Sequence, residues 1–526
     1  MKKAPAFLIV FALVSLAAPA HARNNDTWVE ITSPHFKVSS DSGEKEARRI
    51  ARQLEEIRAV FLVDHPDVRV DGGRPLVVIA VKDEDALKVL LPDFWMAKNA
   101  VHPPGAFYSY GDENFAVLRT DISVRNGDNP YYVLYEDYLF SILRLNYAAI
   151  PLWLSYGIAD YYGNTLIDEK YTEVGHPISF QLSRLNRSTL IPLADLLNAD
   201  GRSPLVNDRD KQPLFHAESW AIVHYLSFNA DVAKQDLLNK YLKAWAETGD
   251  STESARRTFG DLKQFEQKID QYSRLPAFYS QHRPSLTNFS DKDYKVRPLS
   301  NAEALAARAD FLDHTNHVAE AREMLKNALA QQPDLGRVHE CMAFEALTQH
   351  DNDTAEKEFR QALKLDPSSY RSLFYLAEII YRRSGYNPQS LPELLQDLEA
   401  AVQINPDFAP AYGFLSVAYR EQPQTKQKAL DAALKAHKLE PAMFSYVVEI
   451  GDALISLDRD ADARTIRDTL NKTATTPAEK SMAEAFSKRF AHYQEVARQK
   501  NPDNSAKASP ASGAPAPRQP ENQPQP

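Results

Sequence analysis

The hydrophobic positions in the first part of the chain alternate between strand-like and helix-like spacing. Residues 28–38 alternate apolar and polar side chains, as a strand does, with a bend expected at Pro34. Residues 44–63 place apolar side chains three or four positions apart, which predicts an amphipathic helix. Residues 75–82 are apolar and β-branched, as in a strand buried on both faces, and residues 105–120 predict two strands around a turn. The pattern therefore predicts an α+β domain.

Helical spacing dominates the following stretch. Residues 129–146 predict one helix, and Pro151 opens a second, because proline is favoured in the first turn of a helix. Residues 215–228 predict a further amphipathic helix. Residues 281–300 are polar, contain two prolines and show no period, which indicates a linker. We therefore predict that residues 23–280 form the first domain and that a linker follows it.

The texture changes again at Asn301, where the chain becomes rich in alanine, leucine, glutamate and lysine. Prolines then recur at spacings of 34, 39, 35 and 36 residues, at Pro333, Pro367, Pro406, Pro441 and Pro477. Alanines recur five residues before four of them, at Ala328, Ala362, Ala401 and Ala436. This pattern resembles the tetratricopeptide repeat, a helix–turn–helix unit of about 34 residues. We predict an all-α solenoid of about five repeats with a capping helix over residues 301–498.

The two ends of the chain differ from the rest. Lys2 and Lys3 precede an apolar run over residues 7–16 and a small-x-small site at residues 20–22, which together predict a signal peptide at residues 1–22. The protein is therefore expected to be exported, to the periplasm or the medium. Residues 499–526 contain proline, glutamine, alanine and serine without large apolar side chains, and this composition predicts a disordered tail.

Composition excludes some classes of partner. The net charge of -10 over 526 residues argues against nucleic acid, which favours clustered lysine and arginine. No stretch after the predicted signal is apolar enough to cross a membrane, so we expect no membrane span. The single Cys341 excludes an intramolecular disulfide. The expected partner is a protein or peptide bound in the groove of the repeats.

Several stretches of the first 278 residues also carry a family resemblance. They are WVEITSPHFKVSSDSGEKEARRIA, RPLVVIAVKDEDALKVLLPDFW, NPYYVLYEDYLFSILRLNY, IPLWLSYGIADYYGNT and FHAESWAIVHYL. They resemble an exported bacterial family that joins a peptidase-MA-type (gluzincin-like) domain to tetratricopeptide repeats. In that family, the two central helices hold an H-E-x-x-H and a W-L-x-E-G-x-A-E pattern for a catalytic zinc. The resemblance implies an α+β zincin-like fold for the N-terminal domain.

This sequence lacks the zinc-binding residues of that family. Its two histidine positions are occupied by Glu136 and Phe140, its catalytic glutamate position by Asp137, and its third-ligand position by Tyr156. A phenylalanine offers no ligand atom, and a neutral phenol is a poor zinc ligand because its pKa is near 10. The resemblance therefore implies an inactive peptidase homologue with no catalytic residue, no bound metal and no cofactor.

Two readings of these degenerate positions remain open. In one, the Phe140 and Tyr156 rings fill the former ligand shell, and the neighbouring carboxylates face solvent or pair with Arg144. In the other, carboxylates and histidines build a different site for a hard cation. The residues available for that second site are Glu136, Asp137, Asp160, His216, Glu218 and His224.

The function predicted from the sequence is that of an exported, non-catalytic peptidase-like protein. It would act as a protein-binding or scaffold module through its repeats. The alternative is a metal-dependent hydrolase with an unusual ligand set. A third possibility is an assembly factor of the cell envelope, in which the repeats make every partner contact.

Overall fold

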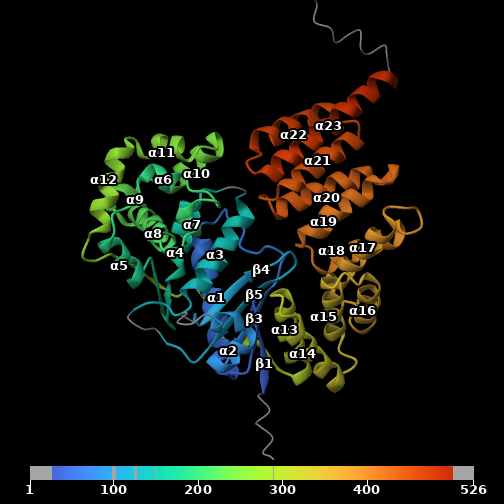
Figure 1. Ribbon diagram of the computed structural model, residues 1–526, viewed down its shortest axis with the longest axis horizontal. Helices are drawn as coiled ribbons and strands as arrows, with labels where there is room; N and C mark the ends of the chain where they lie inside the picture. Colours follow the sequence, from blue (N-terminus) through green and yellow to red (C-terminus); the bar gives the residue numbers. More distant parts are fainter. Residues whose placement is uncertain (1–26, 97–101, 124–126, 148–149, 288, 501–526) are drawn as a thin grey trace, which may run out of the picture.

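The computed structural model describes residues 27–96, 102–123, 127–147, 150–287 and 289–500 (Figure 1). The predicted signal peptide and nearly all of the predicted tail lie outside these residues. No helix in the described part of the chain is long and apolar enough to cross a membrane.

A mixed six-stranded sheet lies at the centre of the molecule, with the strand order β4-β5-β3-β2-β1-β9. Strands β2, β3 and β5 run parallel, while β4, β1 and β9 pair antiparallel with their neighbours. The strands are β1 (Trp28–Thr32), β2 (Lys37–Ser40), β3 (Leu76–Val81), β4 (Gly105–Ser109), β5 (Asn114–Arg119) and β9 (Lys295–Leu299).

The sheet is buried on both faces, as the apolar β3 pattern predicts. Val78 and Ala80 belong to a core shared with helices of the N-terminal half. Ile79 and Val81 point to the opposite face, because side chains alternate along a strand, and join a second core. That second core includes α2 (Glu84–Leu90) and the first helices of the repeats. The sheet is therefore a layer common to both halves of the protein.

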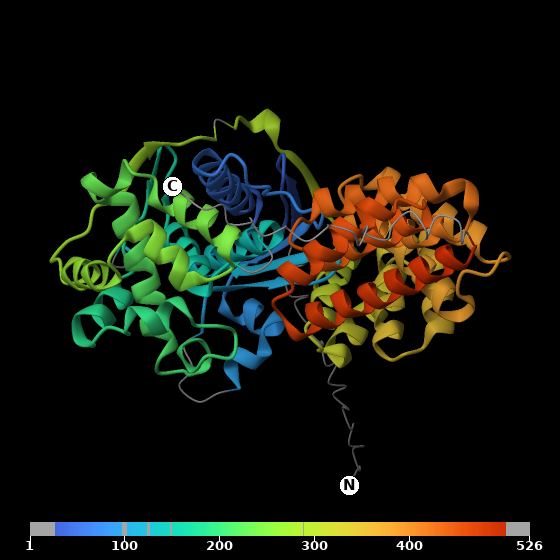
Figure 2. The same cartoon turned by 90° about the horizontal axis from the view of Figure 1, so that it is seen from above.

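In the N-terminal half, the helices of residues 179–273 lie on the side away from the repeats (Figure 2). Its helices are α1 (Glu44–Asp64), α3 (Tyr132–Asn146), α4 (Leu152–Gly163), α5 (Ser179–Arg187), α6 (Leu193–Leu197), α7 (Pro204–Asn207), α8 (Gln212–Phe228), α9 (Ala230–Ala233), α10 (Leu237–Thr248), α11 (Ser251–Phe259) and α12 (Leu262–Ser273). A small second sheet contains β6 (Leu166–Ile167), β7 (Tyr171–Val174) and β8 (Gln281–Pro284).

Residues 301–473 form five successive helix pairs, and the order agrees with the repeat predicted from the prolines. The pairs are α13 (Asn301–His314) with α14 (Val318–Gln331), α15 (Gly336–Thr348) with α16 (Asn352–Leu365), α17 (Tyr370–Ser384) with α18 (Leu391–Ile404), α19 (Ala409–Arg420) with α20 (Lys426–Leu439), and α21 (Phe444–Ser456) with α22 (Asp460–Thr473). Helix α23 (Pro477–Lys500) packs on the last pair. The C-terminal half is thus a helical solenoid.

The segment that we expected to be a linker contains two paired strands. Strand β8 pairs with β7, and β9 pairs with β1 at the edge of the main sheet. Four of the five β9 residues are exposed, so this strand carries no apolar period that would identify it in the sequence. Backbone pairing with an exposed edge holds it, and Pro298 is compatible with that edge position.

A buried ion network joins the turn between β4 and β5 to the first helices of the repeats. The Arg371 side chain, only 2% exposed on α17, donates hydrogen bonds of 2.8 Å to both Asp112 and Glu113 in that turn. It also donates to Asp310 of α13 and Glu340 of α15, at 3.3 and 3.4 Å. One guanidinium, itself in the third repeat, therefore binds carboxylates from the first two repeats and from the N-terminal half.

Two neighbouring groups complete this network. The Arg371 guanidinium lies 4.2 Å from the centre of the Phe344 ring, which covers one of its faces. Arg337 pairs with Glu113, Asp310 and Glu340 at its rim. Burial alone would raise the pKa of Asp112, but the charge of Arg371 lowers it to about 2. Asp112 therefore stays charged throughout the physiological range, whereas burial raises the pKa of Glu113 to about 7 in spite of the charges of Arg371 and Arg337.

A second junction lies between the loop before β3 and the fourth repeat. The Asn405 side chain donates to the Gly73 carbonyl at 2.9 Å, and Arg74 pairs with Glu440 at 2.7 Å. Gly73 has φ 68°, and a Cβ atom there would lie 1.8 Å from the Asp407 carbonyl oxygen. Only glycine allows this close approach.

We expect Arg371→Met to destabilise the protein by about 3–5 kcal/mol, because it removes the central, fully buried counter-charge of these carboxylates. Arg382→Met is the matched control, since Arg382 lies on the same helix in an exposed pair with Glu378. That control should cost about 0.5 kcal/mol or less. Denaturant unfolding of both variants measures the difference, and equal effects would contradict the assigned role of Arg371.

We expect His314 to make the free energy of unfolding fall as the pH rises into the alkaline range. Burial would lower its pKa, but hydrogen bonds to Asp112 and Asp310 outweigh burial and raise the pKa to about 10, against the nearby charge of Arg371. The folded state thus keeps a proton that the unfolded chain releases near pH 6.5. Its contribution is complete below pH 6.5 and is lost as pH rises through about 10.

Unfolding free energies measured from pH 6.5 to 10 should therefore fall more steeply in the wild type than in His314→Gln. The difference in slope is at most about 1.4 kcal/mol per pH unit for one proton. Parallel curves for the two proteins would show that His314 is not held protonated.

Candidate functional site

Three helices of the N-terminal half meet at the candidate site. Helices α3 and α4 follow each other in the chain, and α8 packs across α4. Gly157 on α4 permits this crossing, because a Cβ atom there would lie 2.5 Å from the Ser219 carbonyl oxygen on α8. The glycine that the family pattern expects in this helix therefore has a packing role in this chain.

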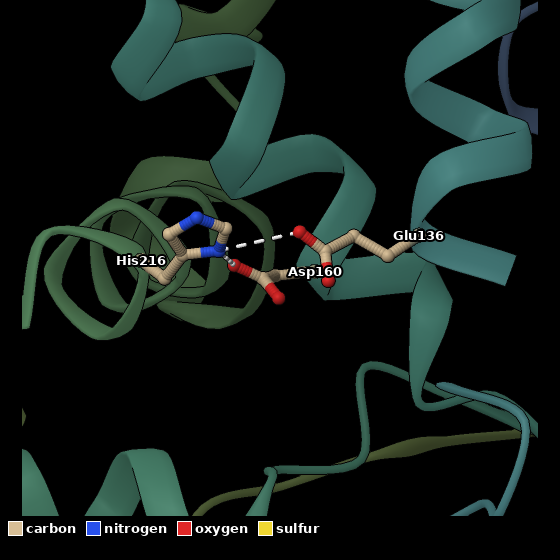
Figure 3. A group of neighbouring side chains, drawn as sticks. All are labelled: Glu136, Asp160 and His216. Atoms are coloured by element: carbon tan, nitrogen blue, oxygen red, sulfur yellow. Dashed lines mark hydrogen bonds and ion pairs between the residues drawn. The ribbon is translucent and has the colours of Figure 1, made fainter. Parts of the chain in front are cut away.

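One polar side chain from each helix enters the contact (Figure 3). The His216 Nδ1 atom on α8 lies 3.2 Å from Glu136 Oε1 on α3 and 3.2 Å from Asp160 Oδ2 on α4. Asp160 is fully buried, and the side chains of Glu136 and His216 are 11% and 14% exposed. Figure 3 shows the Asp160 carboxylate between the other two groups.

Electrostatics favours a proton within this trio. Burial would lower the pKa of His216, but the charge of Asp160 and the hydrogen bonds to Asp160 and Glu136 raise it to about 10. Burial and repulsion by Asp160 raise the pKa of Glu136. Without another cation, the imidazolium of His216 balances the buried carboxylates.

Two aromatic rings lie beside the trio at positions where the resemblance expects ligands. Phe140 and Tyr156 stack with ring centres 5.0 Å apart, and the Tyr156 ring centre lies 4.3 Å from that of His216. The structure therefore brings Phe140 and Tyr156 together beside the trio that contains Glu136.

Asp137 differs from its neighbour Glu136 in facing solvent. Its side chain is exposed on α3 and lines a cleft. Surrounding protein and the nearby charge of Glu136 raise its pKa to about 7. An accessible carboxyl group with this pKa can exchange a proton at neutral pH.

Two other candidates from the sequence lie outside the trio. The Glu218 carboxylate accepts a hydrogen bond from the Ile191 backbone N–H at 2.6 Å. His224 contacts the Tyr272 hydroxyl and the carbonyls of Gly175 and Tyr279. These partners use both nitrogens of His224, so its role is to join chain segments.

A cleft of about 1250 Å³ adjoins the site and separates α3 and β4 from the repeats. Its first wall contains Phe107, Tyr108, Asp137, Phe140 and Arg144. Its second wall comes from the loops before α19 and α21, and includes Asn405, Asp407, Glu440 and Met443. Sequence reasoning missed this second wall, since nothing in the repeat pattern indicates which loop faces the N-terminal half.

Comparison with known proteins supports the C-terminal repeats. Residues 342–407 match the family model described as tetratricopeptide repeat. No curated protein matches the chain. Solved structures of low overall similarity also match part of the chain. They include pilF of Pseudomonas aeruginosa, with 20% identity over 40% of this chain and 97% of its own, and a TM-score of 0.30.

Two other solved structures also match part of the chain. YrrB, titled a TPR protein with an unusual peptide-binding site, is 14% identical over 36% of this chain and 92% of its own, with a TM-score of 0.31. TTC0263 of Thermus thermophilus is 16% identical over 37% of this chain and 98% of its own, with a TM-score of 0.27. The chain contains tetratricopeptide repeats in its C-terminal half.

We expect Gly157→Ala to destabilise the protein by about 1–3 kcal/mol, because the new methyl group would push α4 away from α8. Gly201→Ala is the control, since no atom lies within 4 Å of a Cβ built there. Thermal melts of the two variants compare the effects. A Gly157 variant as stable as the control would mean that the helices can separate at no cost.

Proposed function

We propose that this chain is an exported, non-catalytic peptidase-like protein that binds other polypeptides. The observation that carries the proposal is the 1250 Å³ cleft, whose two walls come from the N-terminal half and from the repeats. Tetratricopeptide repeats support a protein-binding or scaffold role. The cleft adds a place where both halves can contact one partner.

The first-repeat surface is less available than the sequence suggests. The acidic turn between β4 and β5 lies against α13, α15 and α17, where Arg371 and Arg337 bind it. A partner would have to displace this turn to reach those arginines. We therefore place the partner in the cleft and not on the helices of the first three repeats.

The cleft suits an extended segment. Strand β4 is one of the two edge strands of the main sheet in the described part of the chain, and an edge strand is where a further strand can pair. Phe107 and Tyr108 of β4 line the cleft with Met443, which is 42% exposed on the opposite wall. Backbone pairing and these apolar side chains together would hold a polypeptide of varied sequence.

Two features support the remaining parts of the proposal. Phe140 and Tyr156 stack at positions where the resembled family places zinc ligands, and neither offers a good ligand atom. Export is supported by the pattern of residues 1–22, which resembles a signal peptide.

A photo-crosslinker can locate the bound polypeptide. Benzoylphenylalanine at position 443 should capture a peptide selected from a random extended library, because this position lines the cleft. The same group at Leu434, which is 47% exposed on α20 and outside the cleft lining, is the control. Equal capture at both positions, or capture at 434 alone, would contradict the cleft as the binding site.

The non-catalytic part of the proposal has a separate test. Purified protein incubated with fluorogenic casein should release no product above the buffer rate, with or without added zinc. Chelator-sensitive cleavage that disappears in Asp137→Asn would instead establish a metal-dependent hydrolase. Peptide capture in the crosslinking experiment stands independently of this result.

A further inference from the structure

The trio of Glu136, Asp160 and His216 has the composition of a metal site. Two carboxylates and one imidazole come from three different helices, and their ligand atoms lie within 4.8 Å of one another. We propose that these three side chains bind one divalent first-row transition cation, with zinc as the expected metal. This ligand set differs from the one that the resembled family uses. The proposal also departs from our expectation, based on the sequence, that no metal is bound.

The separations within the trio fit a common cation. His216 Nδ1 lies 3.2 Å from an oxygen of Glu136 and 3.2 Å from an oxygen of Asp160. Two ligand atoms bound to one tetrahedral zinc at 2.0–2.1 Å lie about 3.3 Å apart. A cation can therefore replace the Nδ1 proton with little movement of the helices.

A second observation points to a missing ligand. Asp160 is fully buried, yet its Oδ1 atom has no hydrogen-bond partner among the described residues. An unpartnered carboxylate oxygen in the interior is costly, because its lost hydration is not replaced. Figure 3 shows this carboxylate between His216 and Glu136, with one oxygen turned toward His216. A cation bound between the three groups would give the buried carboxylate a further counter-charge.

The donors select the class of cation. An imidazole nitrogen favours zinc and its first-row neighbours, whereas calcium prefers six to eight oxygen ligands. Three protein ligands leave one position of a tetrahedral zinc for water. The Tyr156 ring lies beside the trio, with its centre 4.3 Å from that of the His216 ring.

A bound cation would fasten α3, α4 and α8 to one another. Helix α3 carries Asp137, Phe140 and Arg144 in the cleft wall. The metal would therefore hold the wall of the cleft in place, without requiring that the protein cut its partner. Because it binds the folded state, it would also raise thermal stability as its concentration rises.

Metal content of the tag-free chain from residue 23 tests the proposal. The protein is stripped with chelator, equilibrated with zinc and analysed by mass spectrometry. We expect one zinc per chain, and at least a 100-fold loss of zinc affinity in Glu136→Gln and in His216→Gln. Asp137→Asn is the matched control and should keep the wild-type affinity, since Asp137 neighbours Glu136 but faces solvent.

Two further measurements separate loss of binding from loss of folding. The apo forms of the variants are compared by circular dichroism. If His216→Gln fails to fold, the test rests on Glu136→Gln, which keeps the shape of the side chain. Zinc should raise the melting temperature of the wild type and of Asp137→Asn, but not that of Glu136→Gln. Absence of zinc from the wild type, or wild-type affinity in both ligand variants, would overturn the proposal.

Discussion

The guanidinium of Arg371 makes the contact on which the relation of the two halves depends. It is almost wholly buried, and a buried charge is tolerated only when counter-charges and hydrogen bonds surround it. Here the acceptors come from the β4–β5 turn and from two other repeats. The turn and the first three repeats are therefore fixed together, because separating them would leave the buried Arg371 without its carboxylate partners in the turn.

The apolar layers reinforce this arrangement. Alternate residues of β3 face two different cores, one built with the helices of the N-terminal half and one built with the first repeats. In a sheet with only one buried face, the solenoid would be an appended module. With both faces buried, the first repeats complete the N-terminal fold. This explains why the cleft has walls from both halves, and why its shape is fixed by the packing of the sheet.

At the candidate site, the packing of the helices and the polar side chains between them depend on different residues. Gly157 allows α4 and α8 to cross closely, so the frame needs only small residues and apolar packing. Glu136, Asp160 and His216 meet because three helices converge, while Phe140 and Tyr156 stack beside them. A frame of this kind can hold different polar groups, provided that each buried charge finds a partner.

The amino-acid sequence by itself determined the features that rest on local periodicity. The repeat of prolines and alanines gave the helix pairs of the solenoid, and the apolar run of β3 gave a strand buried on both faces. The sequence also placed Glu136, Phe140 and Tyr156 on two successive helices. It did not give β9, because an exposed edge strand is held by backbone pairing that leaves no pattern in its side chains.

Only the tertiary structure decided the contacts between distant segments. Arg371 reads as an ordinary helix residue in a repeat, and its partners Asp112 and Glu113 lie in a turn more than 250 residues earlier. Likewise, His216 is one of two histidine candidates in the sequence, and only the crossing of α8 over α4 brings it to Asp160. Such contacts depend on how whole helices pack against each other and against the sheet. This packing depends on the entire chain, so it cannot be read from a short stretch of sequence.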